Sequence, residues 1–187
     1  MTVRLTLVCA AAPTGREVRF GDSPLDERAL SRARTAGHGL PGVTVRYSGP
    51  SQWCRATATA LAWHDVTVEH ALRDLDLGRW HGRTLDEVAA DDPAALAAWT
   101  TDPEAAPHGG ESVAALCRRT AAWLDALPEG SGRVAAVVEQ SLARAAVLYA
   151  LNAPCTSFWR VDVPPLAAVE LTGRGGRWNL RWPAAGR

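Results

Sequence analysis

The stretch YSGPSQWCRATATAL, Tyr47–Leu61, links a predicted strand to a predicted helix through a loop of small residues. Residues 43–48 are predicted to form a short strand, and Ser51 is placed to cap a helix over residues 51–63. In sheets of parallel strands, ligands bind beside the loops that follow the strands. The segment therefore predicts an α/β fold with a ligand site at the carboxyl end of this strand.

Strands and helices alternate along the rest of the chain. Short apolar runs followed by turn residues predict strands over residues 3–8, 43–48, 134–138, 158–161, 167–171 and 178–180. Helical spacing predicts helices over residues 24–36, capped by Ser23 or Asp26, over 51–63, over 85–98 with a break near Pro93, over 112–127 and over 142–151. This order predicts a single domain with a mostly parallel sheet covered by helices on both faces.

The overall composition excludes several classes of function. Lys+Arg and Asp+Glu each number 20, so the formal net charge is zero and predicts neither a nucleic-acid nor a membrane partner. Every basic residue is Arg, which excludes a Schiff-base or P-loop lysine. The first apolar run is too short for a signal peptide or a membrane span. The four cysteines are widely spaced without a CxxC motif, so we expect a cytoplasmic protein with reduced thiols and no metal or other cofactor.

Five segments match, in order, the motifs of a known family. They are FGDSPLDERALSRA at residues 20–33, YSGPSQWCRATATAL at residues 47–61, LRDLDLGRWHGRTLDEV at residues 72–88, PHGGESVAALCRR at residues 107–119 and VVEQSLARAAV at residues 137–147. The set resembles the histidine phosphatase superfamily, and among its members it is most similar to the alpha-ribazole phosphatases of cobalamin biosynthesis. The resemblance implies a phosphoglycerate mutase-like, three-layer α/β sandwich over residues 1–187.

The resemblance also implies a cationic phosphate site. In the family, a histidine after the first strand attacks phosphorus, two arginines and a second histidine hold the phosphoryl oxygens, and a carboxylate protonates the leaving group. Such a site needs positive charge because negative charge spreads over the oxygens in the transition state.

The positions that match this site carry other residues. Cys9 and Ala10 stand where the first arginine and the nucleophilic histidine are expected. Trp53 falls on the second arginine position. The second histidine position falls on Glu139 or Gln140, depending on whether it is counted from the following helix or from the preceding strand.

The remaining candidates are three residues with reactive side chains and a set of pocket residues. Asp74 occupies the acid position, and Glu139 and Cys9 are the other candidate catalytic groups, although Cys9 is also interpretable as a buried filler. The other pocket candidates are Ala10, Arg16, Arg19, Trp53, His108, Glu111 and Gln140. No local spacing of ligands predicts a metal site.

These replacements predict a degenerate member of the family. We expect a small-molecule-binding or accessory protein of a biosynthetic pathway, with cobalamin assembly as one instance, and not a histidine-dependent phosphatase or mutase. Its ligand is expected not to be a phosphomonoester, and a homodimer is left open. One alternative is a repurposed isomerase, cyclase or lyase that uses Glu139 and Asp74 as acid and base. The other alternative is a weak residual phosphatase.

Overall fold

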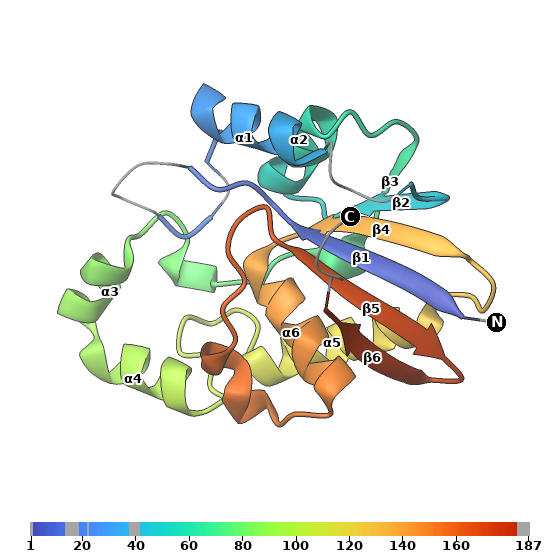
Figure 1. The fold of residues 1–187 in the computed structure, drawn as a ribbon. Helices are drawn as coiled ribbons and strands as arrows, with labels where there is room; N and C mark the ends of the chain where they lie inside the picture. The colour runs from blue at the N-terminus through green and yellow to red at the C-terminus, as the bar shows by residue number, and fades with distance from the viewer. Residues whose placement is uncertain (1, 14–18, 22, 38–41, 183–187) are drawn as a thin grey trace.

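The computed structural model of the protein describes residues 2–13, 19–21, 23–37 and 42–182. Among these residues, six strands form one sheet in the order β3-β2-β4-β1-β5-β6 (Figure 1). The strands are β1 (Val3–Cys9), β2 (Val45–Ser48), β3 (Val66–Val68), β4 (Arg133–Val138), β5 (Ala168–Arg174) and β6 (Arg177–Arg181). β1, β2, β3 and β4 pair in parallel, whereas β5 and β6 run antiparallel to their neighbours, so the predicted mostly parallel sheet is confirmed.

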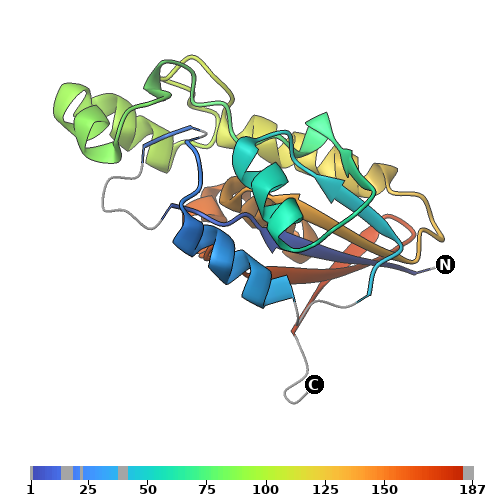
Figure 2. The ribbon, with the colours of Figure 1, turned by 90° about the horizontal axis from the view of Figure 1, so that it is seen from above.

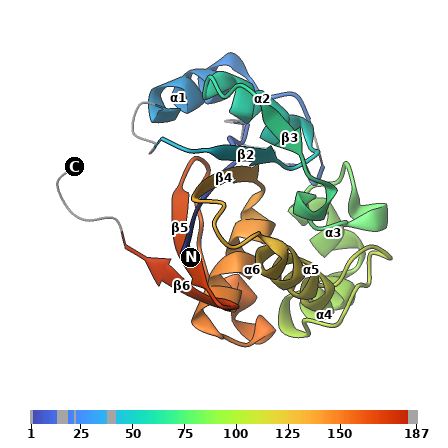
Figure 3. The ribbon, with the colours of Figure 1, turned by 90° about the vertical axis from the view of Figure 1, so that its right-hand side faces the viewer.

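Helices cover both faces of the sheet. The α-helices are α1 (Glu27–Gly37), α2 (Gln52–Ala60), α3 (Leu85–Asp91), α4 (Pro93–Thr101), α5 (Val113–Ala126) and α6 (Gln140–Leu151). Three 3₁₀-helices, η1 (His70–Leu72), η2 (Gly78–Trp80) and η3 (Cys155–Arg160), lie in the connections. α1 and α2 lie on one side of the sheet and α5 and α6 on the other, as Figure 3 shows end-on. α3 and α4 extend beyond the carboxyl ends of the central strands (Figures 1 and 2).

The core follows this layering. Strand residues such as Leu5, Leu7 and Val134 pack with Leu124 and Leu142 on the side of α5 and α6. Their neighbours along the strands point to the opposite face, because successive side chains of a strand alternate. On that opposite face, Val8 and Val137 pack with Cys54 and Ala58 of α2. The strands at the centre of the sheet are therefore buried on both sides at their carboxyl ends, close to the loops that form the site.

Several helix boundaries match the local sequence signals. The hydroxyl oxygen of Ser51 accepts a hydrogen bond from the backbone N–H of Cys54 and caps α2. Ser112 caps α5 in the same way. Of the two candidate caps for the first helix, Asp26 accepts the bond from the N–H of Ala29. The predicted break near Pro93 separates α3 from α4, with the proline in the first turn of α4.

Two strands differ between the sequence prediction and the structure. The predicted strand over residues 158–161 is wrong, because this stretch belongs to η3. In η3 the rings of Phe158 and Trp159 contact each other edge to face at 4.9 Å, and Trp159 also packs on Trp99, whereas a strand would send consecutive side chains to opposite faces. The short strand β3 was not predicted, and its three residues carry too little pattern to identify it.

In the described ranges, no helix is both long and apolar enough to span a bilayer.

The Thr57 hydroxyl ties α2 to the segment after β1. Its oxygen accepts a 3.0 Å hydrogen bond from the buried N–H of Ala11, and Thr57 itself is fully buried. We expect Thr57→Val to lower the free energy of unfolding by about 1–3 kcal/mol, because it leaves that N–H without an acceptor. Urea denaturation measures the loss. Thr59→Val is the matched control, because the exposed Thr59 hydroxyl bonds only within its own helix, and it is expected to stay within about 0.5 kcal/mol of wild type. Equal losses in the two variants would contradict the role given to Thr57.

Candidate active site

The carboxyl ends of three parallel strands meet at one edge of the sheet. Cys9 and Val138 are partners in the register of β1 and β4, and the N–H of Ala10 donates a 2.7 Å bond to the carbonyl of Val138. The N–H of Gly49, which follows β2, donates a 2.9 Å bond to the carbonyl of Val137. These bonds bring the segments after β1, β2 and β4 side by side, where the sequence places the ligand site.

Glu139 lies where the starts of two helices meet. It is the N-cap residue of α6 and is 7% exposed. The hydroxyl of Ser51, the N-cap of α2, donates a 2.6 Å hydrogen bond to Oε1 of Glu139. The Cys54 thiol lies 3.8 Å from the same oxygen. Glu139 therefore lies between the first turns of α2 and α6, whose free backbone N–H groups favour negative charge.

Asp74 follows η1 and is held by the first turn of α6. The Ser141 hydroxyl donates a hydrogen bond to Oδ1 of Asp74, which joins this loop to the helix that begins after Glu139. Asp74 is exposed at the surface of the protein, and the loss of hydration where its carboxyl contacts neighbouring atoms raises its pKa. The hydrogen bond from Ser141 and the charge of Arg119 act in the opposite direction. A carboxyl with a raised pKa keeps its proton to a higher pH and is suited to act as an acid.

Cys9 is the last residue of β1 and is influenced by both carboxylates. Burial raises the pKa of Cys9 far above its usual value, and the negative charges of Glu139 and Asp74 raise it further. Cys9 is fully buried and packs in the core beneath the sheet. Because the thiolate is the nucleophilic form, this environment favours the interpretation of Cys9 as a packing side chain. The hydrogen bond from Ser141, two residues after Glu139 on α6, brings Asp74 and Glu139 to the same helix start.

Arg119 of α5 fixes the loop that carries Asp74. Its guanidinium donates to the carbonyls of Ala71, at 2.6 Å, and Arg73, at 3.0 Å. The same group forms a two-armed ion pair with Glu111, with N···O distances of 2.9 and 2.6 Å. Arg119 and Glu111 are 12% and 11% exposed at their side chains, so water screens this pair only weakly. Glu111 therefore acts on the site through Arg119 and the loop.

Ala10 and Trp53 belong to one apolar cluster. Both pack with Val8, Cys54 and Val137. The indole N–H of Trp53 donates to the carbonyl of Ser23. The methyl of Ala10 and the indole thus lie in the same apolar cluster as Cys54, whose thiol is 3.8 Å from Oε1 of Glu139.

The other predicted pocket residues lie in different surroundings. His108 is buried between Trp80 and Trp99, its Nδ1 accepts from the N–H of Gly110, and burial lowers its pKa. Arg19 is exposed and pairs with Glu87 at 3.2 Å. Arg16 lies outside the described residues. Glu139 directly follows the end of β4 at Val138. Gln140 comes next and is the first residue of α6.

Several residues that shape the site were not predicted from the sequence. Ser51 and Ser141 bond the two carboxylates, and Arg119 orders the loop before Asp74. Each of these three residues lies inside a matched motif, but its hydrogen-bond partner is 45 to 88 residues away in the sequence. The local spacing of residues therefore does not predict these bonds. Arg144 of the same helix as Ser141 forms an ion pair with Asp162 at 3.8 Å, and its guanidinium lies 5.7 Å from the centroid of the Trp159 ring.

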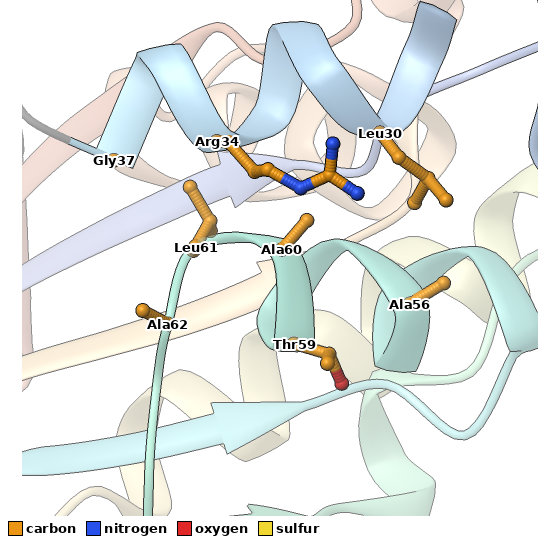
Figure 4. A pocket seen from close by; sticks show the side chains of 8 residues that line it. All are labelled: Leu30, Arg34, Gly37, Ala56, Thr59, Ala60, Leu61 and Ala62. Carbon is orange, nitrogen blue, oxygen red and sulfur yellow. The ribbon is translucent and has the colours of Figure 1, made fainter. Parts of the chain in front are cut away.

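A separate cavity of about 690 Å³ opens between α1 and α2 (Figure 4). Its lining includes Leu30, Arg34 and Thr59 and contains none of the predicted site residues. Within the described part of the chain, no group of three or more His, Cys, Asp or Glu side chains is arranged to hold a metal ion.

The fold is that of an α/β protein, and the candidate ligand site lies at the carboxyl ends of its parallel strands. The chain belongs to the histidine phosphatase superfamily (branch 1), because the sequence model of that family matches residues 10–185. The resemblance drawn from the five motifs is thereby confirmed, and with it the fold class.

Named relatives are phosphatases. The glucosyl-3-phosphoglycerate phosphatase of Mycolicibacterium vanbaalenii is 38% identical over 91 residues, which are 46% of this chain and 39% of that protein. The Mycobacterium tuberculosis protein of the same name is 46% identical over 71 residues, which are 36% of this chain and 32% of that protein. The chain thus matches less than two fifths of the length of these relatives.

Solved structures agree over nearly the whole chain. The mycobacterial glucosyl-3-phosphoglycerate phosphatase superposes with a TM-score of 0.82 at 25% identity, covering 96% of this chain and 97% of that one. The alpha-ribazole phosphatase from Shigella flexneri gives a TM-score of 0.81 at 19% identity, covering 95% and 94%, and supports the fold alone.

These comparisons correct the functional prediction. The chain was expected to be a degenerate accessory protein and not a histidine-dependent phosphatase or mutase, on the evidence of Ala10, Trp53 and Glu139. Its relatives are named phosphatases, so that expectation is wrong, and so is the alternative of an isomerase, cyclase or lyase. The remaining alternative, a weak phosphatase, agrees better with the relatives.

The Arg119 contacts lead to a prediction about stability. We expect Arg119→Met to lower the free energy of unfolding by about 3 kcal/mol, because Glu111 and two backbone carbonyls lose a partner in a poorly hydrated place. Thermal and urea denaturation measure the change. Arg118→Met is the control, since Arg118 and Glu104 are both 66% exposed and their pair contributes at most about 1 kcal/mol. A loss for Arg119→Met no larger than that of the control would show that the loop does not depend on this arginine.

The buried thiols lead to a prediction about reactivity. At pH 8 in the native protein, Cys9 and Cys54 are expected to resist a disulfide reagent such as DTNB, because both are fully buried and burial raises the pKa of each. In denaturant both thiols should react at once. Peptide mapping after alkylation identifies the modified positions. Rapid native labelling of Cys9 would argue against its assignment as a packing side chain.

Proposed function

We propose that the chain is a phosphomonoester phosphatase of low turnover that acts at the carboxyl ends of β1, β2 and β4. The observation that supports this proposal is that Asp74 and Glu139 both lie at the first turn of α6, in a chain whose relatives are phosphatases. Each is fixed by a serine at the start of a helix, Ser141 for Asp74 and Ser51 for Glu139.

Asp74 supplies the acid in this proposal. A phosphomonoester breaks its bond between phosphorus and the leaving oxygen, and the departing alkoxide needs a proton. The raised pKa of Asp74 favours the protonated carboxyl that can give it. Ser141 orients the carboxyl, and Arg119 holds the backbone that carries it. The family resemblance assigns the same role to this position.

Glu139 supplies the base. A water molecule between Glu139 and the phosphoryl group gives its proton to the carboxylate while its oxygen forms the new bond to phosphorus. The bond to the leaving oxygen breaks at the same time, and that oxygen takes the proton of Asp74. The products are the free alcohol and inorganic phosphate. One carboxyl ends protonated and the other ionised, and a proton exchange with solvent restores the starting state.

Two helix starts supply positive potential for the phosphoryl oxygens. The hydrogen bond between Ser51 and Glu139 shows that the first turns of α2 and α6 meet at this point. Backbone N–H groups at helix starts bind phosphate oxygens without a charged side chain. Dipoles stabilise the transition state less than two guanidiniums do, which is the reason for expecting low turnover.

The names of the relatives suggest the first substrate to test. Glucosyl-3-phosphoglycerate is the substrate in the name of two relatives and of a similar structure. We propose a phosphorylated sugar or sugar acid of this kind as the substrate class, with p-nitrophenyl phosphate as a general probe.

Phosphate release by purified variants tests the two carboxyl groups. We expect Asp74→Asn to lower kcat/KM about 100-fold, because general acid catalysis contributes on this order. Glu139→Gln should cause a loss of similar size. Asp86→Asn, which changes an exposed carboxylate on α3, is the control and should leave kcat/KM unchanged.

The pH profile gives a second readout. Asp74 must be protonated to act, so kcat/KM should fall as the pH rises through its raised pKa, and Asp74→Asn should abolish that alkaline limb. Activity that survives in both Asp74→Asn and Glu139→Gln would contradict the proposal. Detection of a phosphohistidine after rapid quenching would contradict direct attack by water. It would show that the phosphoryl group is first transferred to a histidine of this chain.

A further inference from the structure

Arginines gather on one face of the sheet, away from the active site. Leu5 of β1 points towards α5 and α6, so its neighbour Arg4 points to the opposite face. The same alternation applies to the arginines that flank buried residues of β4, β5 and β6. Together these side chains form what we call the basic face, consisting of Arg4, Arg133, Arg174, Arg177 and Arg181.

The guanidiniums of the basic face have no carboxylate partners in the described structure. All five arginines are exposed. Elsewhere in the described ranges, eight arginines form ion pairs, and none of the eight lies on this face. Glu170 lies opposite Arg181 in the register of β5 and β6 but forms no ion pair with it. The excess of positive charge on this face is therefore not balanced by the protein's own strand residues.

The strand register places like charges directly beside each other. Arg4 is the Cα partner of Arg133, and Arg174 is the Cα partner of Arg177. Like charges at paired positions of a sheet are destabilising. An anion bound across each pair would remove this repulsion, and guanidinium groups suit phosphate oxygens because they donate two parallel hydrogen bonds. The arrangement therefore points to a ligand that carries phosphate.

The size of the basic face indicates a chain of phosphates. Strands lie about 4.8 Å apart and rise about 3.4 Å per residue, so the distance from β4 to β6 and that from Arg177 to Arg181 are each about 14 Å. A single phosphate contacts at most two of these arginines at once. A polymer with repeated phosphates can contact all five.

An exposed aromatic side chain follows the last arginine of the basic face in the sequence. Trp182 follows Arg181 directly and is 83% exposed. Nucleic-acid bases stack on such side chains in proteins that bind single strands, next to arginines that hold the backbone. The other strand residues among the arginines, Glu170, Thr172 and Asn179, are polar or charged, so the face offers hydrogen bonds and too little apolar surface to enter a bilayer.

We propose that the basic face binds single-stranded nucleic acid, with the five arginines on the phosphates and Trp182 stacked on a base. The net charge of zero gave no reason to expect such a partner. The site is independent of the carboxylates Asp74 and Glu139, because it lies at the opposite ends of β1 and β4 and on the β5–β6 hairpin.

Fluorescence anisotropy with a labelled oligothymidylate of about a dozen nucleotides tests the proposal, using the full-length protein at low salt. The variant Arg4→Gln/Arg133→Gln should bind roughly tenfold more weakly than wild type. Two lost phosphate contacts should also make the slope of log K against log salt shallower by about 1.4. Trp182→Ala should weaken binding while leaving the salt slope unchanged, because stacking releases no counterion.

The matched control is Arg118→Gln/Arg160→Gln, which removes two exposed charges from α5 and η3. It should bind within about twofold of wild type, and circular dichroism should show all variants folded. Equal binding by the Arg4→Gln/Arg133→Gln variant and wild type would overturn the proposal. Equal or tighter binding of a duplex of the same length would exclude stacking on Trp182. Binding to anionic phosphatidylserine vesicles without binding to the oligonucleotide would assign the face to a membrane instead.

Discussion

The parallel register of β1 and β4 is the constraint on which the site depends. Pairing Cys9 with Val138 makes both strands end at the same level, so that Ala10 and Glu139 leave the sheet side by side. A shift of one residue would reverse every side chain of β1 and expose its buried face. The bond from Ala11 to Thr57 and the bond from Gly49 to Val137 then fix α2 and the end of β2 against the same edge.

The acid and the base of the proposed reaction are carried by different parts of the fold. Glu139 belongs to the strand–helix unit of β4 and α6, whereas Asp74 belongs to the loop that Arg119 holds against α5. Ser141 joins the two, because it lies in the first turn of α6 and bonds to Asp74. A shift of α6 along its axis would therefore move both carboxyl groups together. This coupling explains why a serine without chemistry of its own matters to the geometry.

The fold was predictable from the sequence because it is encoded in short motifs, each with its own caps and apolar spacing. Ser51, Ser112 and the break at Pro93 are local signals, and the structure confirms them. The long-range bonds of Ser51 and Ser141 were not predictable, since they join residues far apart in the chain. His108 shows the same limit, because it was predicted to line the pocket, yet it is buried against Trp80. The predicted function was wrong because replacements such as Ala10 do not by themselves exclude the phosphatase activity that is named for the relatives.

The segregation of arginines has a consequence for how the molecule behaves in bulk. The formal net charge of zero is a total over the whole chain. It combines a positive face on the hairpin of β5 and β6 with a helical side on which arginines form ion pairs with carboxylates. Such a molecule has a permanent electric dipole. Near a negatively charged surface it turns the hairpin towards that surface before it makes contact.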